Sequence, residues 1–369
     1  MTRLFVASDD GVAIVTRRRG AWEAKVVLAG LPAQCLAADP LHPEIVFCGT
    51  FGQGLWRTLD AGDRWERVGP GIASGEITAV AVSASERDGR SGVVWAGTEP
   101  SALYRSEDQG TSWEERPNLK ALPSAPTWSF PPRPWTHHVR WIEPDPTAEN
   151  RLFVAIELGG VMRSEDGGRT WEDRKPHARR DAHTLRAHPM APGRVYEAAG
   201  DGYAETRDGG NSWEEGDGGL DHHYLWGLAV DPADPDTVVV SASPGPRHAH
   251  DLHWDEGDWH RTRAAPDERR TPQTVPPEGP WQGPQATLYR RHGQDPWSPV
   301  TDGLPPPWGT PAYVLATSQH EGHVIYGTPL RDAIYRSEDA GASWERLAVA
   351  WPERFGSGRV RSLLGVIGA

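Results

Sequence analysis

Histidine, arginine and carboxylate side chains recur at matching places in the middle of this chain, where they could move protons, hold anions or bind a metal ion. The places are the starts of three successive predicted strands, which we align by the turns that end them. The residues that coincide are His137, Arg180 and His223; His138, Asp181 and Tyr224; and Arg140, His183 and Trp226. An earlier strand carries Leu31, Pro32 and Gln34 there. Because titratable groups replace mostly unreactive ones, these positions are candidates for a functional site.

Acid–base catalysis beside an anion-binding group is the chemistry that these residue types support. We assign proton transfer to His138 or His183, because imidazole exchanges protons near neutral pH, and we assign an orienting or ligating role in catalysis to Glu157. Arg140 and Arg247 would hold negative charge on a substrate. The six residues assigned to substrate binding are Arg140, His223, Tyr224, Arg247, Glu99 and His248. Glu99 and Glu157 follow equivalent strands, so they are the carboxylate pair to test for glycoside cleavage.

A divalent metal is an alternative occupant of the same place. Neutral imidazoles on neighbouring strands can converge on one ion, so the candidate ligands are His138, His183, His223 and Glu157. No short-spaced ligand motif accompanies them, and no other cofactor is predicted. A purely structural role, in which these side chains cap backbone groups or pair with acidic neighbours, is the remaining reading. The sequence leaves the three readings open.

A repeated motif determines the elements that must position these residues. The pattern Ser/Thr-x-Asp-x-Gly-x-x-Trp begins at Thr58, Ser106, Ser164, Thr206 and Ser337. Short Ser, Thr and Asp side chains hydrogen-bond to nearby backbone amides, and Gly supplies the positive φ that a tight turn needs. An aromatic-rich strand precedes each copy, and the Trp opens the next strand. The motif carboxylates are therefore predicted to stabilise turns rather than to act as catalysts or Ca²⁺ ligands.

The motif resembles the Asp-box, or bacterial neuraminidase repeat, of sialidase-like β-propellers, and the resemblance covers nearly the whole chain. It implies a sialidase-like, glycosyl hydrolase-like propeller scaffold. The Arg-Ile-Pro segment of sialidases does not occur here, and their arginine trio cannot be assigned residue by residue. Xyloglucan-cleaving relatives work in a cleft between two propellers, whereas this chain supplies one. Photosystem assembly factors share the repeat without being enzymes.

Each motif belongs to a unit of four strands, A to D from the axis outward, and the units number seven when two degenerate copies are admitted. One degenerate unit opens the chain around Leu4 to Ala7, and the other is interrupted after Val238 to Ser241, where His292 replaces the motif Asp. The first unit lacks a strand A, while residues 360 to 366 form a strand without a unit. Pairing these ends would close the ring and remove exposed sheet edges. We therefore predict one all-β domain over residues 1–369, a seven-bladed β-propeller with four-stranded antiparallel blades.

Three insertions interrupt the repeat, at residues 117–136, about 244–286, and 304–311. The first and third join strand D to the next strand A, and the second joins strands B and C. In an antiparallel blade these two kinds of connection emerge on the same face. The insertions are rich in proline and aromatic residues, which makes them stiff. We predict that all three surround one mouth of the central channel.

Composition limits the classes of partner. The net charge of −13 argues against nucleic acid and against anionic membranes, both of which favour a basic surface. No segment has the length and apolar character of a membrane span, and the first residues lack the features of a secretory signal. A cytoplasmic location is therefore expected.

Two functions stay open at this point. The first is a His/Arg/Glu-lined pocket that binds a polar, anionic or sugar-like small molecule, with hydrolysis or elimination as the reaction. The second is a non-catalytic scaffold that uses the aromatic insertions to hold a protein partner, as photosystem assembly factors would.

Overall fold

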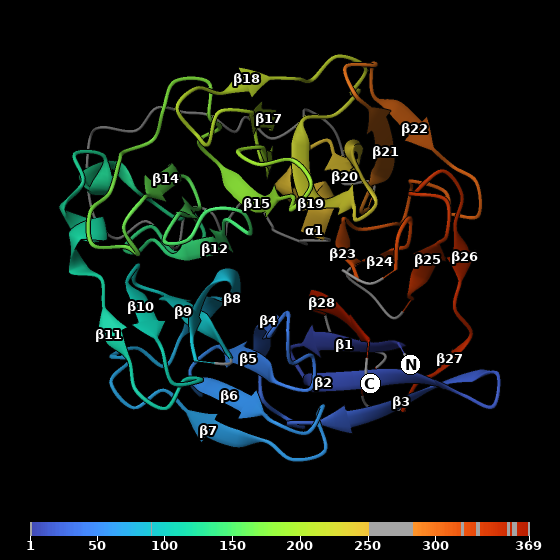
Figure 1. The fold of residues 1–369 in the computed structure, drawn as a ribbon. Coiled ribbons are helices and arrows are strands. Elements are labelled where there is room, and N and C mark those ends of the chain that lie inside the picture. The colour runs from blue at the N-terminus through green and yellow to red at the C-terminus, as the bar shows by residue number, and fades with distance from the viewer. Residues whose placement is uncertain are drawn as a thin grey trace.

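Seven β-sheets are arranged radially around a central axis in the computed structural model of the chain (Figure 1). The structure describes residues 2–89, 91–250, 283–318, 321–329, 333–352, 355 and 360–367. Most of the insertion at 244–286 therefore lies outside the described residues. The predicted fold class, a seven-bladed β-propeller, is confirmed. None of the helices in the described part of the chain is long and apolar enough to cross a membrane.

The blades follow one another along the chain, and the strands of each blade are named in order from the axis outward. Blade one contains β28 (Val360–Ile367), β1 (Thr2–Ser8), β2 (Gly11–Arg18) and β3 (Ala21–Val27). Blade two contains β4 (Ala33–Ala38), β5 (Val46–Thr50), β6 (Leu55–Thr58) and β7 (Glu66–Val68). Blade three contains β8 (Ile77–Asp88), β9 (Ser91–Thr98), β10 (Leu103–Ser106) and β11 (Glu114–Glu115). Blade four contains β12 (Val139–Pro144), β13 (Leu152–Ile156) and β14 (Gly160–Ser164).

The remaining three blades each have four strands. Blade five contains β15 (Ala182–Ala187), β16 (Val195–Ala199), β17 (Gly202–Thr206) and β18 (Glu214–Glu215). Blade six contains β19 (Tyr224–Asp231), β20 (Asp234–Ser243), β21 (Thr287–His292) and β22 (Ser298–Val300). Blade seven contains β23 (Tyr313–Thr317), β24 (Ile325–Pro329), β25 (Tyr335–Ser337) and β26 (Glu345–Arg346). Outside the blades lie two 3-10 helices, η1 (Pro117–Ala121) and η2 (Ala125–Thr127), and the helix α1 (Pro246–His250). Strand β27 (Val349–Ala350) is a fifth, outermost strand of the blade-one sheet.

The two ends of the chain close the ring, as predicted. β28 supplies the missing innermost strand of blade one and pairs antiparallel with β1, from Thr2 opposite Ile367 to Ser8 opposite Val360. β27 pairs in parallel with β3, so the same terminal segment also covers the outer edge of this blade. Both sheet edges of the N-terminal hairpin are thereby occupied.

Blade four differs from the prediction of four strands. In place of a fourth strand, one residue pair, Arg163 and Glu172, exchanges both backbone hydrogen bonds, at 3.1 and 2.8 Å. The chain then turns toward the first insertion, because a carboxylate oxygen of Asp173 accepts a hydrogen bond from Ser124 N at 2.8 Å. The Arg174 side chain donates to Gly159 O at 2.9 Å. These side-chain contacts replace the continued ladder.

The Asp-box carboxylates stabilise turns, as predicted. In the blade-five copy, Thr206 Oγ1 donates to Asp208 Oδ1 at 2.8 Å and accepts from Gly210 N at 2.9 Å. Ser212 N donates to the same carboxylate at 2.9 Å. The other four copies repeat these three bonds. The motif glycine has a positive φ in each copy, 87° at Gly210, which a side chain would strain.

An arginine of the preceding blade holds each Asp-box turn from outside. The acceptor is the carbonyl of the residue just before the motif glycine. The donor and acceptor pairs are Arg3 and Ala61, Arg57 and Gln109, Arg116 and Gly167, Arg163 and Gly209, and Arg290 and Ala340. These bonds join each blade to the next, a repeated contact that the motif alone does not reveal.

The blade-six turn lacks the motif Asp and is held differently, as the sequence indicated. His292 Nδ1 lies 3.1 Å from Thr237 Oγ1 and 3.3 Å from Asp234 Oδ2. Gly293 N donates to Asp236 O at 2.9 Å. A neighbouring turn of the same blade thus takes the place of the motif carboxylate.

The Asp-box carboxylates are expected to make the fold sensitive to acid. Burial alone would raise the pKa of Asp208, but hydrogen bonds from Ser212 and Thr206 outweigh burial and lower the pKa to about 2. Because the folded-state pKa lies below the unfolded-state value, this carboxylate stabilises the fold above about pH 4, and the contribution disappears as the pH falls toward about 2. The Asp208→Asn variant should therefore lose less unfolding free energy than the parent on acidification. Urea unfolding at about pH 5 and about pH 2.5 measures this.

The exposed Glu345 on β26 supplies the control for that experiment. Glu345→Gln should follow the parent at both pH values. If Asp208→Asn also follows the parent, the Asp-box carboxylate does not contribute to acid sensitivity.

Candidate functional site

Local bulges turn candidate side chains out of the innermost strands. The pairing of β12 with β13 skips from Val139 to Trp141, which leaves Arg140 as the extra residue. The pairing of β15 with β16 skips His183 in the same way, and the β19 pairing is shifted at Trp226. A bulge re-aims the side chain of its unpaired residue. The structure therefore places Arg140, His183 and Trp226 at equivalent positions, in agreement with the sequence alignment.

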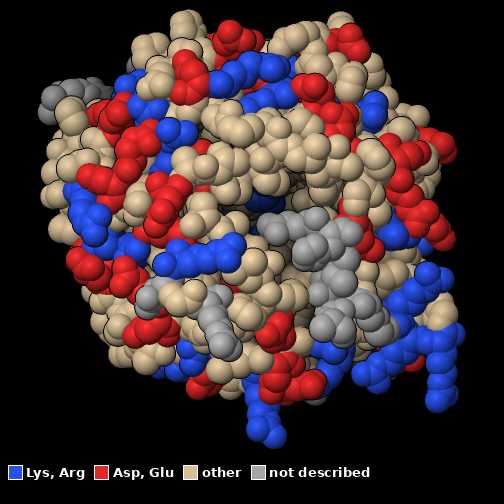
Figure 2. All heavy atoms as spheres, viewed as in Figure 1, with Lys and Arg blue, Asp and Glu red and all other residues tan. Residues whose placement is uncertain are grey.

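A small cavity lies where these bulges meet the channel. Arg140 and Trp226 line it together with Arg186 of β15 and Arg361 of β28, and its volume is about 30 Å³. Figure 2 shows basic side chains inside the central hollow and charges of both signs mixed over the surrounding face. A water molecule needs roughly 10–15 Å³ of such volume, so this cavity has room for water and not for a sugar.

Glu157 is the carboxylate at the centre of the cluster. It follows β13, and its Oε2 lies 3.0 Å from His138 Nε2 and 3.8 Å from Arg140 Nε. Burial would raise the pKa of Glu157, but attraction to His138, His183 and Arg140 outweighs burial and lowers the pKa to about 2. Glu157 is therefore an anion at neutral pH, so it is suited to orienting a group or binding a cation and not to donating a proton.

His183 is fully buried on the bulge of β15. Its Nδ1 lies 2.6 Å from Leu225 O, and its ring packs between Tyr224 and Trp226, with centroids 5.0 and 4.8 Å away. Its Nε2 faces Asp181 Oδ1 at 3.6 Å. Burial would lower the pKa of His183, but the carboxylates of Asp181 and Glu157 outweigh burial and raise it.

Asp181 is a member of this cluster that the sequence reasoning treated only as an alignment partner and a structural neighbour. One ligand atom from each of Glu157, Asp181 and His183 lies within 4.8 Å of the other two. The alignment of Asp181 with His138 was the one sequence signal that pointed to Asp181. Two carboxylates and an imidazole from adjacent blades therefore converge, and these three residues could hold a metal ion.

Glu99 is held by a residue of the first insertion, Arg133, which the sequence did not single out. Arg133 donates to both carboxylate oxygens of Glu99, with Nε at 2.6 Å from Oε1. The guanidinium also lies 4.7 Å from the centre of the Phe130 ring. His138 Nδ1 approaches Glu99 Oε2 at 3.7 Å. Glu99 is thus tied to Arg133 and placed beside His138.

The other candidates lie around this cluster. The Arg140 guanidinium stacks on the Trp226 ring at 4.4 Å, and the Tyr224 hydroxyl lies 3.0 Å from His250 Nε2. Arg247 and His248 belong to α1, whose Ala249 packs with Tyr224 and Trp226. Burial lowers the pKa of His248. His223 is exposed, and no contact of its ring with Glu157 or His183 is found in the described part of the chain.

No protein-family model matches the chain, and no curated protein matches it in sequence. Among solved structures, YCF48 bound to a D1 peptide has a TM-score of 0.54 at 14% identity, covering 86% of this chain and 82% of that one. An ancestral GH74 enzyme has a TM-score of 0.58 at 16% identity, covering 90% of this chain and 38% of the enzyme. Chaetomium thermophilum Sqt1, bound to the N-terminus of ribosomal protein L10, has a TM-score of 0.50 at 11% identity, covering 89% of this chain and 77% of that one. Identities this low establish a shared fold alone, so the chain is a seven-bladed β-propeller similar in fold to YCF48 and to GH74 propellers.

Proposed function

We propose that this chain is a non-catalytic binding propeller that holds a protein partner on the face carrying the insertions. The observation that carries the proposal is the position of two tryptophans that are exposed in the described part of the chain. Trp135 is 72% exposed and Trp308 is 56% exposed. Both lie in connections from a strand D to the next strand A, which leave the blades on the same face. An exposed tryptophan on such a face is a typical anchor of a protein interface.

The backbone that carries each tryptophan is fixed before any partner arrives. Around Trp308, Ala286 N donates to Pro307 O at 3.3 Å and Gly309 N donates to Pro284 O at 2.8 Å. The first insertion sends Leu119 and Trp128 into the core between blades three and four. Binding to such preorganised loops costs little conformational entropy, which favours affinity.

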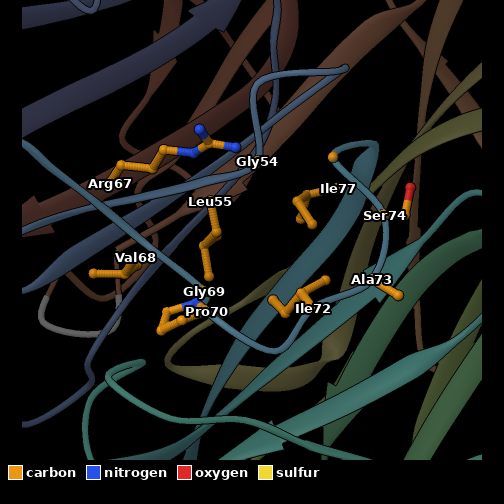
Figure 3. A pocket seen from close by; sticks show the side chains of 11 residues that line it. Gly54, Leu55, Arg67, Val68, Gly69, Pro70, Ile72, Ala73, Ser74 and Ile77 are labelled. Atoms are coloured by element: carbon orange, nitrogen blue, oxygen red, sulfur yellow. The ribbon is translucent and has the colours of Figure 1, made fainter.

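A groove at another connection of this kind, from strand D of blade two to strand A of blade three, offers a further contact. Its volume is about 510 Å³, and Leu55, Val68 and Ile72 form its apolar wall. Figure 3 shows Arg67 at one end of the groove and Ser74 at the other. An extended peptide segment with apolar side chains and a carboxylate toward Arg67 would match this lining.

Neighbours in fold support a peptide ligand. YCF48 has been seen with a D1 peptide and Sqt1 with the N-terminus of ribosomal protein L10. Of the two functions left open by the sequence, the protein-binding scaffold therefore has more support than the sugar-processing enzyme.

Removing the exposed tryptophans is expected to weaken partner binding without changing stability. Peptides selected on the parent from a displayed library should bind Trp135→Ala or Trp308→Ala about 30-fold more weakly, because hot-spot truncations cost about 2 kcal/mol or more. Fluorescence anisotropy with the labelled peptides measures the dissociation constants, and thermal melting checks that the fold is intact.

Met190 provides a matched control. It is 62% exposed and lies between β15 and β16, a connection from strand A to strand B on the opposite face. Met190→Ala should leave peptide binding unchanged. Selected peptides that lose affinity to Met190→Ala and not to the tryptophan variants would contradict the proposal.

A further inference from the structure

We infer that Glu157, Asp181 and His183 form a binding site for one divalent transition-metal ion at the mouth of the central channel. This goes beyond the proposed partner binding and does not depend on it. One ligand atom from each residue lies within 4.8 Å of the others, and the residues come from blades four and five. Ligands of zinc lie about 2.0–2.2 Å from the ion. At a tetrahedral angle two such ligands lie about 3.4 Å apart, so ligand atoms as far apart as 4.8 Å would have to approach one another by about 1.4 Å.

The hydrogen bonding of His183 identifies which nitrogen would bind. A carbonyl oxygen only accepts, so Nδ1, 2.6 Å from Leu225 O, must carry the proton. In the neutral ring, Nε2 then presents a lone pair toward Asp181 Oδ1 at 3.6 Å. Nε2 is buried and has no hydrogen-bond partner among the described residues. Two acceptors 3.6 Å apart, of which His183 Nε2 is fully buried, are stabilised by a positive charge between or beside them.

The arrangement around Nδ1 is the one that metal-binding histidines show. Such a histidine commonly donates its other ring N–H to a backbone carbonyl, which fixes the tautomer and the direction of the lone pair. The rings of Tyr224 and Trp226 pack against His183 and hold its orientation. The orientation of the ring, and with it the direction of the Nε2 lone pair, is therefore fixed before an ion binds.

Glu157 is likewise held in place by groups outside the metal site. His138 Nε2 lies 3.0 Å from Glu157 Oε2, and Arg140 Nε lies 3.8 Å from the same oxygen. Hydrogen bonds to a ligating carboxylate orient it and tune the ion's affinity. Arg140 also adds positive charge nearby, which offsets part of the attraction of the two carboxylates for a cation.

The donor types select the class of ion. One imidazole nitrogen with two carboxylates suits Zn²⁺, Co²⁺ or Mn²⁺, whereas Ca²⁺ and Mg²⁺ prefer oxygen ligands alone. Three protein ligands would leave at least one coordination position for water. The competing explanation is that a proton on Nε2 makes His183 a simple ion-pair partner of Asp181.

Metal titration of the full chain, prepared without a histidine tag, separates these explanations. Co²⁺ is the probe, because its visible absorption reports coordination, and Zn²⁺ is the competitor. We expect one Co²⁺ per chain, displaced by Zn²⁺, with affinity at least about 10-fold weaker in Asp181→Asn and in Glu157→Gln. Zn²⁺ should raise the melting temperature of the parent but not that of the double variant, which carries both Asp181→Asn and Glu157→Gln. The reason is that an ion that binds only the folded state stabilises that state.

Two controls match the ligands in type. His188 is buried and bonds to Asp231 O at 3.0 Å, and Glu143 lies 3.8 Å from Arg186, so neither belongs to the cluster. His188→Gln and Glu143→Gln should bind Co²⁺ as the parent does. His183→Gln tests the third ligand. If that variant does not fold, the two carboxylate variants decide.

Absence of stoichiometric Co²⁺ and Zn²⁺ binding by the parent would overturn the inference and leave the proton on Nε2 as the explanation. Stoichiometric binding that persists in Asp181→Asn, Glu157→Gln and the double variant would overturn it as well, because the ion would then sit elsewhere. Neither result affects the tryptophan experiment, which uses peptides and no metal.

Discussion

A chain that ends at Phe355 is expected to lose the cooperative unfolding transition of the parent. This truncation removes β28, which pairs with β1 over its whole length and forms the innermost strand of blade one. Val360, Leu363 and Val366 are buried, at 3%, 6% and 5% exposure. Each such side chain contributes about 1.5–3 kcal/mol of burial free energy. The sum approaches the total stability of a typical domain, about 5–15 kcal/mol.

Loss of the strand also opens the ring. β28 packs against β4 of blade two and against β23 of blade seven. Its removal takes away the contacts of the innermost strand of blade one with both neighbouring blades, and it exposes the inner edge of β1. Unpaired edges favour aggregation. Urea unfolding followed by tryptophan fluorescence, with light scattering for association, measures both effects.

Two further chains make this experiment decisive. A chain that ends at Ile367 keeps all of β28 and should unfold as the parent does. A synthetic peptide with the sequence of β28, added to the truncated chain, should restore the transition by adding a strand to the open edge. A truncated chain with the parent's midpoint and no response to the peptide would show that β28 does not close the ring.

Replacing Trp344 by alanine is expected to lower the unfolding free energy by about 3–5 kcal/mol. Trp344 is the last residue of the blade-seven Asp-box, is 5% exposed, and donates its indole N–H to Gly341 O at 3.2 Å. It packs with Val239 of blade six and Leu315 of blade seven. The ring thus links two blades, and its loss leaves a cavity that the rigid strands cannot fill.

The matched control is Trp135→Ala, which removes the same side chain from an exposed place. Its unfolding free energy should stay within about 0.5 kcal/mol of the parent. Chemical denaturation of the parent, Trp344→Ala and Trp135→Ala under one set of conditions gives the comparison. Equal losses for the two variants would mean that the Asp-box tryptophan has no special structural role.

The cluster around Glu157 shows how far sequence reasoning reached toward a site. It predicted that His138, His183 and Glu157 would lie near one another, and the structure places all three together, with His138 Nε2 3.0 Å from Glu157 Oε2. It did not identify Arg133, because the partner of Glu99 comes from an insertion with no repeat to align. The catalytic and substrate-binding roles assigned from sequence stay predictions.

The sequence by itself determined the blades, the number of blades and the closure of the ring. The blades follow from contacts between residues close in sequence, such as Thr206, Asp208 and Gly210, whose side-chain types predict the hydrogen bonds of their own turn. Closure of the ring followed from the repeat, because the first unit lacks a strand A and residues 360 to 366 form a strand without a unit. Only the tertiary structure decided that Asp181 joins Glu157 and His183, and that the arginines hold the next blade's turns. The physical reason is that bulge register and side-chain direction depend on strands paired across and between blades. No local pattern encodes those distances.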